Sequence, residues 1–209
     1  MTDINHAGGK ESGCTSAQQA LKWLIEGNRR YVAGQTDPPD LSAARRSVLR
    51  SKGQQPFAVV LTCSDSRVPP EHIFNQGLGD LFVVRVAGNV VDDVTMGSIE
   101  YGAEHLGSPL LLVLGHDYCG AVKATVDGGE APGSIGAIVE RIKPTVDLLK
   151  QAGVRGEDLY RKVEDENILA VINEIEKSPI IHHMVEQGQL TIVGAKYHLG
   201  SGEVTFIEI

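Results

Sequence analysis

The stretch FAVVLTCSDSRVPPEH, residues 57–72, is the segment of this chain that most strongly indicates its fold. It begins with an apolar run typical of a buried strand, and Cys63, Asp65 and Arg67 follow at alternate positions between small serines. Two prolines then prevent any regular element from continuing. A segment that served only for packing would not carry its polar groups in this pattern. We therefore infer that a strand ends here and directs reactive groups towards one spot.

The rest of the chain alternates between apolar runs and helical patterns. Further buried strands are predicted at residues 81–86, 109–114 and 190–193, and helices at 15–34, 41–53, 96–106, 121–126, 135–149 and 159–187. Strands that alternate with helices predict a mostly parallel sheet with right-handed crossovers. The closing segment EVTFIEI alternates apolar and polar residues, which predicts an antiparallel edge strand.

The predicted fold class is therefore α/β. A mostly parallel central sheet of four strands plus the antiparallel edge strand is flanked by helices, and a helical extension precedes it. That extension begins with a helix for which Thr15 and Gln18 make a capping box.

Composition excludes several classes of protein. The chain has 209 residues and a formal net charge of -8, which argues against a general nucleic-acid binder because such proteins carry a basic surface. No stretch approaches the roughly 20 apolar residues of a membrane span, and the N-terminus lacks the apolar segment of a secretory signal. Three widely spaced cysteines do not indicate a disulfide framework. A cytoplasmic location is expected, where cysteines more often bind metal or act in catalysis.

A second reactive segment, LGHDYCGAV, follows the strand predicted at 109–114. His116 and Cys119 are three residues apart at the expected start of a helix, so both can face one point. Because parallel sheets bind ligands beyond the carboxyl ends of their strands, Cys63 should arrive at the same edge. Two thiolates and one imidazole are donors that zinc prefers in a tetrahedral site.

The number of ligands favours a catalytic site. A structural zinc site would be closed by a fourth cysteine or histidine, but the remaining cysteine, Cys14, lies in the expected N-terminal tail. Three protein ligands with a fourth position open to water are the catalytic pattern. Asp65 is an alternative occupant of that fourth position.

These segments resemble those of the β-class carbonic anhydrases. The resemblance rests on CSDSR and GHDYCGAV, together with RVAGN at 85–89 and GSIEY at 97–101, and it spans roughly residues 21–209. It implies a carbonate dehydratase, a zinc lyase that reversibly hydrates carbon dioxide to bicarbonate and a proton. One zinc ion per subunit is implied.

The resemblance also implies roles for the reactive residues. Cys63, His116 and Cys119 ligate zinc, which lowers the pKa of its bound water toward about 7. Asp65 orients the zinc-bound hydroxide for attack on carbon dioxide. Arg67 pairs with Asp65 bidentately, which keeps that carboxylate ionised and turned away from the metal. In an inactive state, Asp65 would itself be the fourth ligand.

Substrate-binding residues are carried over where positions match the family pattern. Gln54 stands nine positions before the first ligand, where a glutamine donates to substrate oxygen in plant-type members. Phe82 and Tyr101 match aromatic positions of a pocket across a dimer interface. Ala87 holds an aliphatic position at which valine or isoleucine is common, so this wall is expected to be looser. The amide of Gly120 matches a backbone donor.

Val60 stands where a bicarbonate-inhibited subset of the family has tryptophan, so we expect that inhibitory site to be absent. His72 is a candidate proton shuttle, with a loop or surface role as the alternative.

The family pocket is completed by a second subunit, which implies a homodimer at minimum and a tetramer as an alternative. The expected division of the chain is a flexible tail at 1–14 and a single domain at 15–209, with residues 15–52 as a helical arm that contacts the partner.

Other functions remain open on the sequence alone. A carbonyl sulfide or carbon disulfide hydrolase would use the same zinc site. This alternative stays open because the small Ala87 leaves the pocket wall looser. A non-enzymatic zinc-stabilised module would bind zinc and hydrate no carbon dioxide. A cysteine-nucleophile hydrolase is disfavoured because Arg67 follows Cys63 by only four positions and a metal would sequester the thiolate. A nucleotide-binding sheet is disfavoured because GLGDLF at 77–82 lacks the third glycine of the fingerprint.

Overall fold

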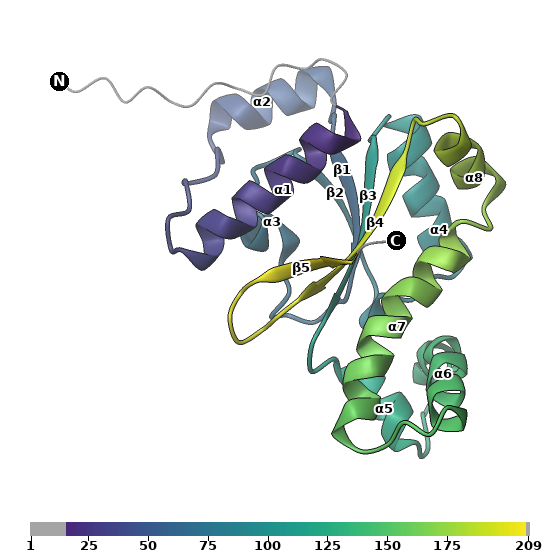
Figure 1. Ribbon diagram of the computed structural model, residues 1–209. Helices are drawn as coiled ribbons and strands as arrows, with labels where there is room; N and C mark the ends of the chain where they lie inside the picture. The colour runs from purple at the N-terminus through teal and green to yellow at the C-terminus, as the bar shows by residue number, and fades with distance from the viewer. Residues whose placement is uncertain (1–15, 208–209) are drawn as a thin grey trace.

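The structure, a computed structural model, describes residues 16–207 and centres on a five-stranded sheet (Figure 1). Its strands are β1 Ala58–Thr62, β2 Leu81–Arg85, β3 Leu110–His116, β4 Thr191–Tyr197 and β5 Val204–Ile207. Their order across the sheet is β2-β1-β3-β4-β5. The first four strands are parallel and β5 runs antiparallel to β4, which confirms the predicted fold class.

Helices cover both faces of the sheet in the described part of the chain. They are α1 Ala17–Val32, α2 Ala43–Lys52, α3 Pro70–Ile73, α4 Asp93–Glu100, α5 Gly120–Asp127, α6 Ile135–Gln151, α7 Glu157–Ile175 and α8 Pro179–Glu186. A short 3-10 helix, Ala87–Asn89, follows β2, and a π-helix, Tyr101–His105, continues α4.

Strand β1 lies between β2 and β3, so the chain leaves β1 on one side and later returns to the other. Open parallel sheets bind ligands at such a reversal of strand order, beyond the carboxyl ends of the strands. The register pairs Thr62 with Leu114, which brings Cys63 level with the last residues of β3. The Thr62 hydroxyl reinforces this register by donating to the carbonyl oxygen of Leu114 at 2.8 Å. Two reactive segments that are distant in the sequence therefore meet.

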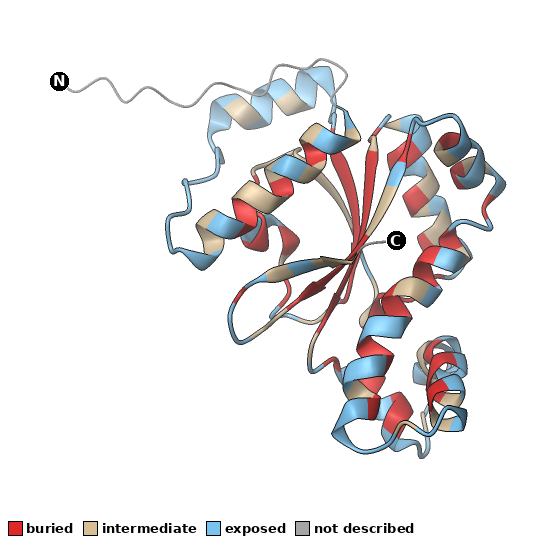
Figure 2. Ribbon diagram, viewed as in Figure 1, coloured by how far each residue is buried: buried red, intermediate tan, exposed pale blue. Residues whose placement is uncertain are grey.

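The core consists of two layers, one on each face of the sheet (Figure 2). Val60 and Leu112 point to the face covered by α1 and α3. Their strand neighbours Val59 and Leu111 point to the face covered by α4, α7 and α8. Because both faces are covered, β1 and β3 are buried along their whole length, as expected for central strands of a parallel sheet.

A third apolar cluster lies beyond the carboxyl ends of the strands. Helices α5 and α6 pack there against the first turns of α7, and the cluster includes Cys63 and Cys119. Cys63 and Cys119 therefore pack among residues of α5, α6 and the start of α7. Figure 1 shows these three helices grouped together at one end of the sheet.

Several predicted boundaries were wrong. The strand expected to end at 114 continues to His116, because its last residues still pair with β4. The helix predicted at 96–106 begins earlier, at Asp93, and becomes a π-helix from Tyr101. The helical segment at 159–187 is two helices, since Ser178 begins α8 as its N-cap.

The start of α1 also differs from the prediction. Thr15, the expected cap, lies outside the described residues, and Ser16 is the N-cap, accepting a hydrogen bond from the amide of Gln19. The helix packs on its own subunit: the buried Asn28 donates to the carbonyl oxygens of Ile73 and Gly202. The contact of residues 15–52 with a partner subunit stays a prediction. None of the ten residues of α2 is buried, which leaves this helix free for such a contact.

No helix within residues 16–207 has the length and apolar character needed to cross a membrane.

Candidate metal centre

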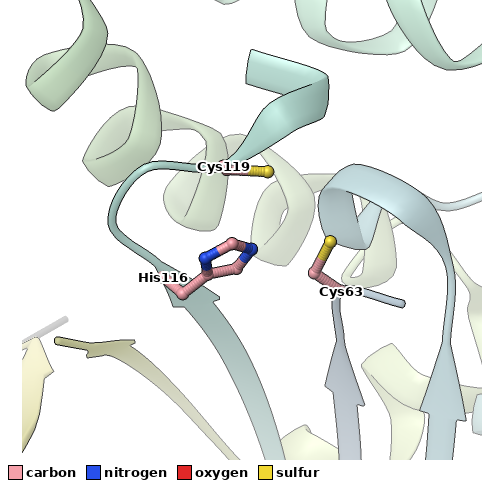
Figure 3. Close-up of side chains that lie close together, drawn as sticks. All are labelled: Cys63, His116 and Cys119. Atoms are coloured by element: carbon pink, nitrogen blue, oxygen red, sulfur yellow. The ribbon is translucent and has the colours of Figure 1, made fainter. Parts of the chain in front are cut away.

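Three potential metal ligands converge at the carboxyl edge of the sheet (Figure 3). Cys63 follows β1, His116 is the last residue of β3, and Cys119 is the N-cap of α5. Their ligand atoms all lie within 4.8 Å of one another, and all three residues are buried. The structure thus brings together the three ligands predicted from the sequence.

The imidazole of His116 is oriented for ligation. Its Nδ1 donates to the carbonyl oxygen of Asp117 at 2.7 Å, which leaves Nε2 as the unprotonated nitrogen. Nε2 is buried and has no hydrogen-bond partner among the described residues. A buried polar atom without a partner costs roughly 1–3 kcal/mol, and a metal ion at this point would remove that cost.

The two cysteine side chains shift each other's pKa in opposite directions. A hydrogen bond with Cys119 holds the pKa of Cys63 well below its ordinary value, against the opposing effect of burial, and His116 and the amide of Gly88 act in the same direction. The same bond with Cys63, together with burial, raises the pKa of Cys119. Cys63 is therefore a ready thiolate, and a divalent cation would favour ionisation of Cys119 as well.

Asp65 lies beside the three ligands and is held by Arg67. Arg67 Nε donates to Asp65 Oδ1 at 2.9 Å, Nη2 donates to Oδ2 at 2.7 Å, and the backbone amide of Arg67 donates to Oδ1 at 2.9 Å. The side-chain bond from Arg67 lowers the pKa of Asp65 to about 2, against partial burial. Asp65 Oδ2 lies 4.0 Å from His116 Nε2. An ionised carboxylate therefore stands at the rim of the cluster without entering it.

Arg85 fixes the backbone that carries these groups. From the end of β2, its Nε donates to the carbonyl oxygen of Cys63 at 3.1 Å and its Nη2 to that of Asp65 at 2.6 Å. Arg67 Nη2 also reaches the carbonyl oxygen of Tyr118 at 3.2 Å, which joins the loop after β1 to the loop after β3. The two arginines thus tie together the segments that carry the ligands.

The donor set fits zinc. Two sulfurs and one imidazole nitrogen suit a borderline-soft cation, and zinc sites with three protein ligands leave a fourth position for water or substrate. The unpartnered Nε2 of His116 and the low pKa of Cys63 are the features of this chain that match such an ion.

The predicted substrate-binding residues fall into two groups. Gly120 is the first residue of α5, next to Cys119, and Ala87 adjoins Gly88, whose amide donates to Cys63 Sγ at 3.3 Å. Both therefore lie at the edge that carries the ligands.

The other group lies near the amino ends of the strands, away from the ligands. Gln54 precedes β1, and Phe82 pairs in register with Val59, four residues before Cys63. That separation corresponds to roughly 13 Å along a strand. Tyr101 packs against Phe82, with ring centroids 6.0 Å apart. One subunit alone does not bring these three residues to its own ligand cluster.

His72 lies in α3, is exposed, and lines a cavity of about 440 Å³ between α3 and the segment that links α1 to α2. The cavity is also lined by Tyr31, Asp37 and Asn75, and its lining includes none of the three ligands. The role of His72 in proton transfer stays a prediction.

Sequence reasoning missed the residues behind the ligands. Glu164 and Asn167 lie on α7, and Lys196 lies on β4, and all three are buried. Helix α7 contains many polar residues. The sequence does not distinguish the buried Glu164 and Asn167 from the exposed polar residues around them, so no signal in the sequence identified them.

Comparisons with known proteins show which family this chain resembles in sequence and fold. The sequence profile of the family described as carbonic anhydrase matches residues 58–204. The chain is 45% identical over 190 residues to a carbonic anhydrase of Mycolicibacterium smegmatis, which covers 88% of this chain and 90% of that protein. It is 42% identical over 192 residues to carbonic anhydrase 2 of Mycobacterium tuberculosis, covering 90% and 91%. The solved Coccomyxa β-carbonic anhydrase in complex with acetazolamide has a TM-score of 0.68 at 30% identity, covering 90% of this chain and 86% of that one.

Proposed function

Because this chain belongs to the β-carbonic anhydrase family and is a carbonate dehydratase, we propose that it hydrates carbon dioxide reversibly at one zinc ion per subunit, held by Cys63, His116 and Cys119. Asp65 and Arg67 are the catalytic dyad. The observation that carries the proposal is the convergence of three buried soft ligands beside a carboxylate that an arginine holds by both oxygens.

A zinc ion held by Cys63, His116 and Cys119 would supply a nucleophile at neutral pH, since zinc lowers the pKa of water from 15.7 to about 7. Asp65 Oδ2, beside these ligands, would accept a hydrogen bond from the attacking group and orient it towards the carbon atom of the substrate. Arg67 keeps Asp65 ionised, so the carboxylate stays an acceptor throughout the neutral range. The bidentate contact would also restrain Asp65 from becoming the fourth metal ligand, which is consistent with the absence of the inhibitory bicarbonate site expected from Val60.

The pocket requires a second copy of the chain. Gln54, Phe82 and Tyr101 lie near the amino edge of the sheet, so in this proposal they line the site of the other subunit. Strand β2 forms one edge of the sheet, and within residues 16–207 no strand pairs with its outer side. A homodimer at minimum is proposed, with a tetramer as the alternative assembly. We also propose a cytoplasmic location, where the cysteine ligands stay reduced.

Stopped-flow hydration of carbon dioxide tests this function. We expect turnover that requires zinc, that is lost on chelation and that returns with zinc. The same preparations are assayed for hydrolysis of carbonyl sulfide and carbon disulfide. This is the alternative activity, because the small Ala87 is expected to loosen one wall of the pocket. Faster hydrolysis of either sulfur compound would replace the proposed substrate, and stoichiometric zinc without any turnover would indicate a non-enzymatic zinc-stabilised module.

A further inference from the structure

The geometry points to one turn of α7 as the element that positions both cysteine ligands, Cys63 through Asn167 and Cys119 through Glu164. This inference rests on the proposed function only in so far as both sulfurs hold a metal. Asn167 and Glu164 are positioning residues, since each acts on a ligand through a backbone amide or carbonyl.

Asn167 acts through Gly88. Its Nδ2 donates to the carbonyl oxygen of Gly88 at 3.0 Å in a buried setting, and the amide of Gly88 donates to Cys63 Sγ at 3.3 Å. The asparagine therefore anchors the residue that supplies the N–H···S bond. Such a bond withdraws charge from a thiolate and fixes its direction, and partners of this kind tune metal sites.

The backbone around Gly88 is unusual. Gly88 has a φ of 73° and the next residue, Asn89, has a φ of 45°, so two consecutive residues adopt the left-handed conformation. Glycine adopts this conformation readily, but at Asn89 it costs of order 1–3 kcal/mol and persists only when the surroundings hold it. The Asn167 amide is one such restraint.

Glu164 acts on Cys119 directly. Its Oε1 accepts from the backbone amide of Cys119 at 3.4 Å, and its other oxygen lies 3.0 Å from Lys196 Nζ. The side chains of Glu164 and Lys196 are only 6% and 11% exposed. Burying an ion pair costs several kcal/mol per ion in desolvation, so stability alone does not account for this pair. In this inference Glu164 serves to orient Cys119. Lys196, whose Nζ also donates to Asp165 Oδ1 at 2.8 Å, balances the negative charge that Glu164 places near the thiolates.

Helix α7, which carries Glu164 and Asn167, also packs closely against β3. Ile168, adjacent to Asn167, lies against the strand that carries His116: a Cβ built on Gly115 would be 2.7 Å from Ile168 Cδ1. Glycine at this position lets the helix approach β3 closely. Glu164 and Asn167 are three residues apart and so share one helix face. Helix α7 therefore contacts the segments that carry His116 and Cys119. It reaches Cys63 through Gly88.

The first test uses Asn167→Asp on the zinc-loaded protein. The aspartate has the same shape, but in its ionised form it has no proton to donate to the carbonyl oxygen of Gly88. We expect transfer of zinc to a chelator to be about 10–100-fold faster than in the wild type. The sulfur-to-metal charge-transfer absorption of the cobalt-substituted protein should also shift. Asn173→Asp is the matched control, since it makes the same change at an exposed position of α7 and should leave both readouts unchanged.

The second test separates orientation from stability at Glu164. Both E164Q/K196M and E164M/K196M remove the buried ion pair, but only the first keeps an oxygen that accepts from the Cys119 amide. We expect E164M/K196M to release zinc about tenfold faster than E164Q/K196M. Glu166→Gln, an exposed change on the same helix, is the control. This pair also decides the matter if Asn167→Asp fails to fold.

The outcomes distinguish this inference from the proposed function, because neither readout is turnover. Zinc release and cobalt spectra of Asn167→Asp that match the wild type overturn the inference, as does equal zinc release from the two double variants. A wild-type protein that binds zinc but hydrates no carbon dioxide overturns the proposed function alone. A wild-type protein that binds no metal overturns both.

Discussion

Arg67 holds Asp65 by both carboxylate oxygens, with Nε and Nη2 at 2.9 and 2.7 Å. The Arg67 side chain is 54% exposed, whereas that of Asp65 is 16% exposed. The pair therefore spans the boundary between the ligand cluster and solvent. A planar guanidinium fixes the direction of the carboxylate as well as its charge, which a lysine at this position would not do.

Asp65→Asn should abolish most turnover while zinc content stays at wild-type stoichiometry. The amide can donate a hydrogen bond, so it no longer selects one orientation of the nucleophile, and it removes the negative charge that Arg67 holds. We expect kcat/KM for carbon dioxide to fall by about 10²–10⁴-fold. Stopped-flow hydration and elemental analysis of the same samples check this.

Asp158→Asn provides the matched control, since Asp158 is exposed in the first turn of α7 and its ion pair with Arg161 lies at the surface. It should retain wild-type turnover. Full activity in Asp65→Asn would contradict the role given to the dyad.

The Asp65–Arg67 pair should stabilise the fold fully above about pH 4 and progressively less at lower pH. The pKa of Asp65 is about 2 in the folded chain, compared with about 3.9 in an unfolded one. The unfolded state therefore takes up this proton first as the pH falls, and the contribution is complete above pH 4 and lost between about pH 4 and 2.

Arg67→Gln tests this pH dependence. Urea unfolding of the variant and the wild type should differ at pH 5–7, and the difference should shrink as the pH approaches 2. Protonation of the zinc ligands is common to both proteins and cancels in the comparison. A difference in unfolding free energy that is independent of pH would show that Arg67 acts through packing rather than through Asp65.

Gly88→Ala should destabilise the fold and weaken metal binding together. A Cβ there would lie 2.8 Å from Ile142 Cδ1 and 3.0 Å from Ala121 Cβ, and the φ of 73° disfavours alanine. We expect a loss of about 1–3 kcal/mol in unfolding free energy. Gly97→Ala is an informative contrast, because its Cβ would meet nothing within 4 Å inside α4. It should be neutral or stabilising by up to about 1 kcal/mol.

Mixing two inactive variants should restore turnover if the pocket is shared between subunits. Cys63→Ser removes a metal ligand, and Tyr101→Ala removes a pocket residue that lies near the other edge of the sheet. In a mixed dimer, one of the two sites receives an intact metal cluster and an intact Tyr101. Activity of the re-equilibrated mixture should exceed the average of the two parent proteins. Activity equal to that average would show that each subunit works alone.

Much of the candidate site could be predicted from the sequence because its residues follow strand ends. Cys63 and His116 each come after an apolar run, and parallel strands bring such positions to one edge. The spacing of His116 and Cys119 then completes the cluster. The same reasoning predicted the strand arrangement correctly, since strands alternating with helices leave few topologies.

The rest depended on packing that the sequence does not encode locally. The sequence showed no reason for Asn167 to face Gly88, because that contact requires α7 to lie against β3. The change to a π-helix at Tyr101 is accompanied in the sequence by Gly102, but an isolated glycine does not predict a π-helix. The placement of Gln54 and Phe82 near the far edge became evident only once the strand register was known.

Cys63 and His116 become neighbours only when β1 and β3 pair, so an unfolded chain offers no preformed site. If the three side chains hold zinc as proposed, free zinc would stabilise the native state by mass action, by about 4 kcal/mol when its concentration is 1,000-fold above the dissociation constant. A cell short of zinc would then lose this protein to proteolysis as well as to inactivity, and its abundance would follow the metal supply.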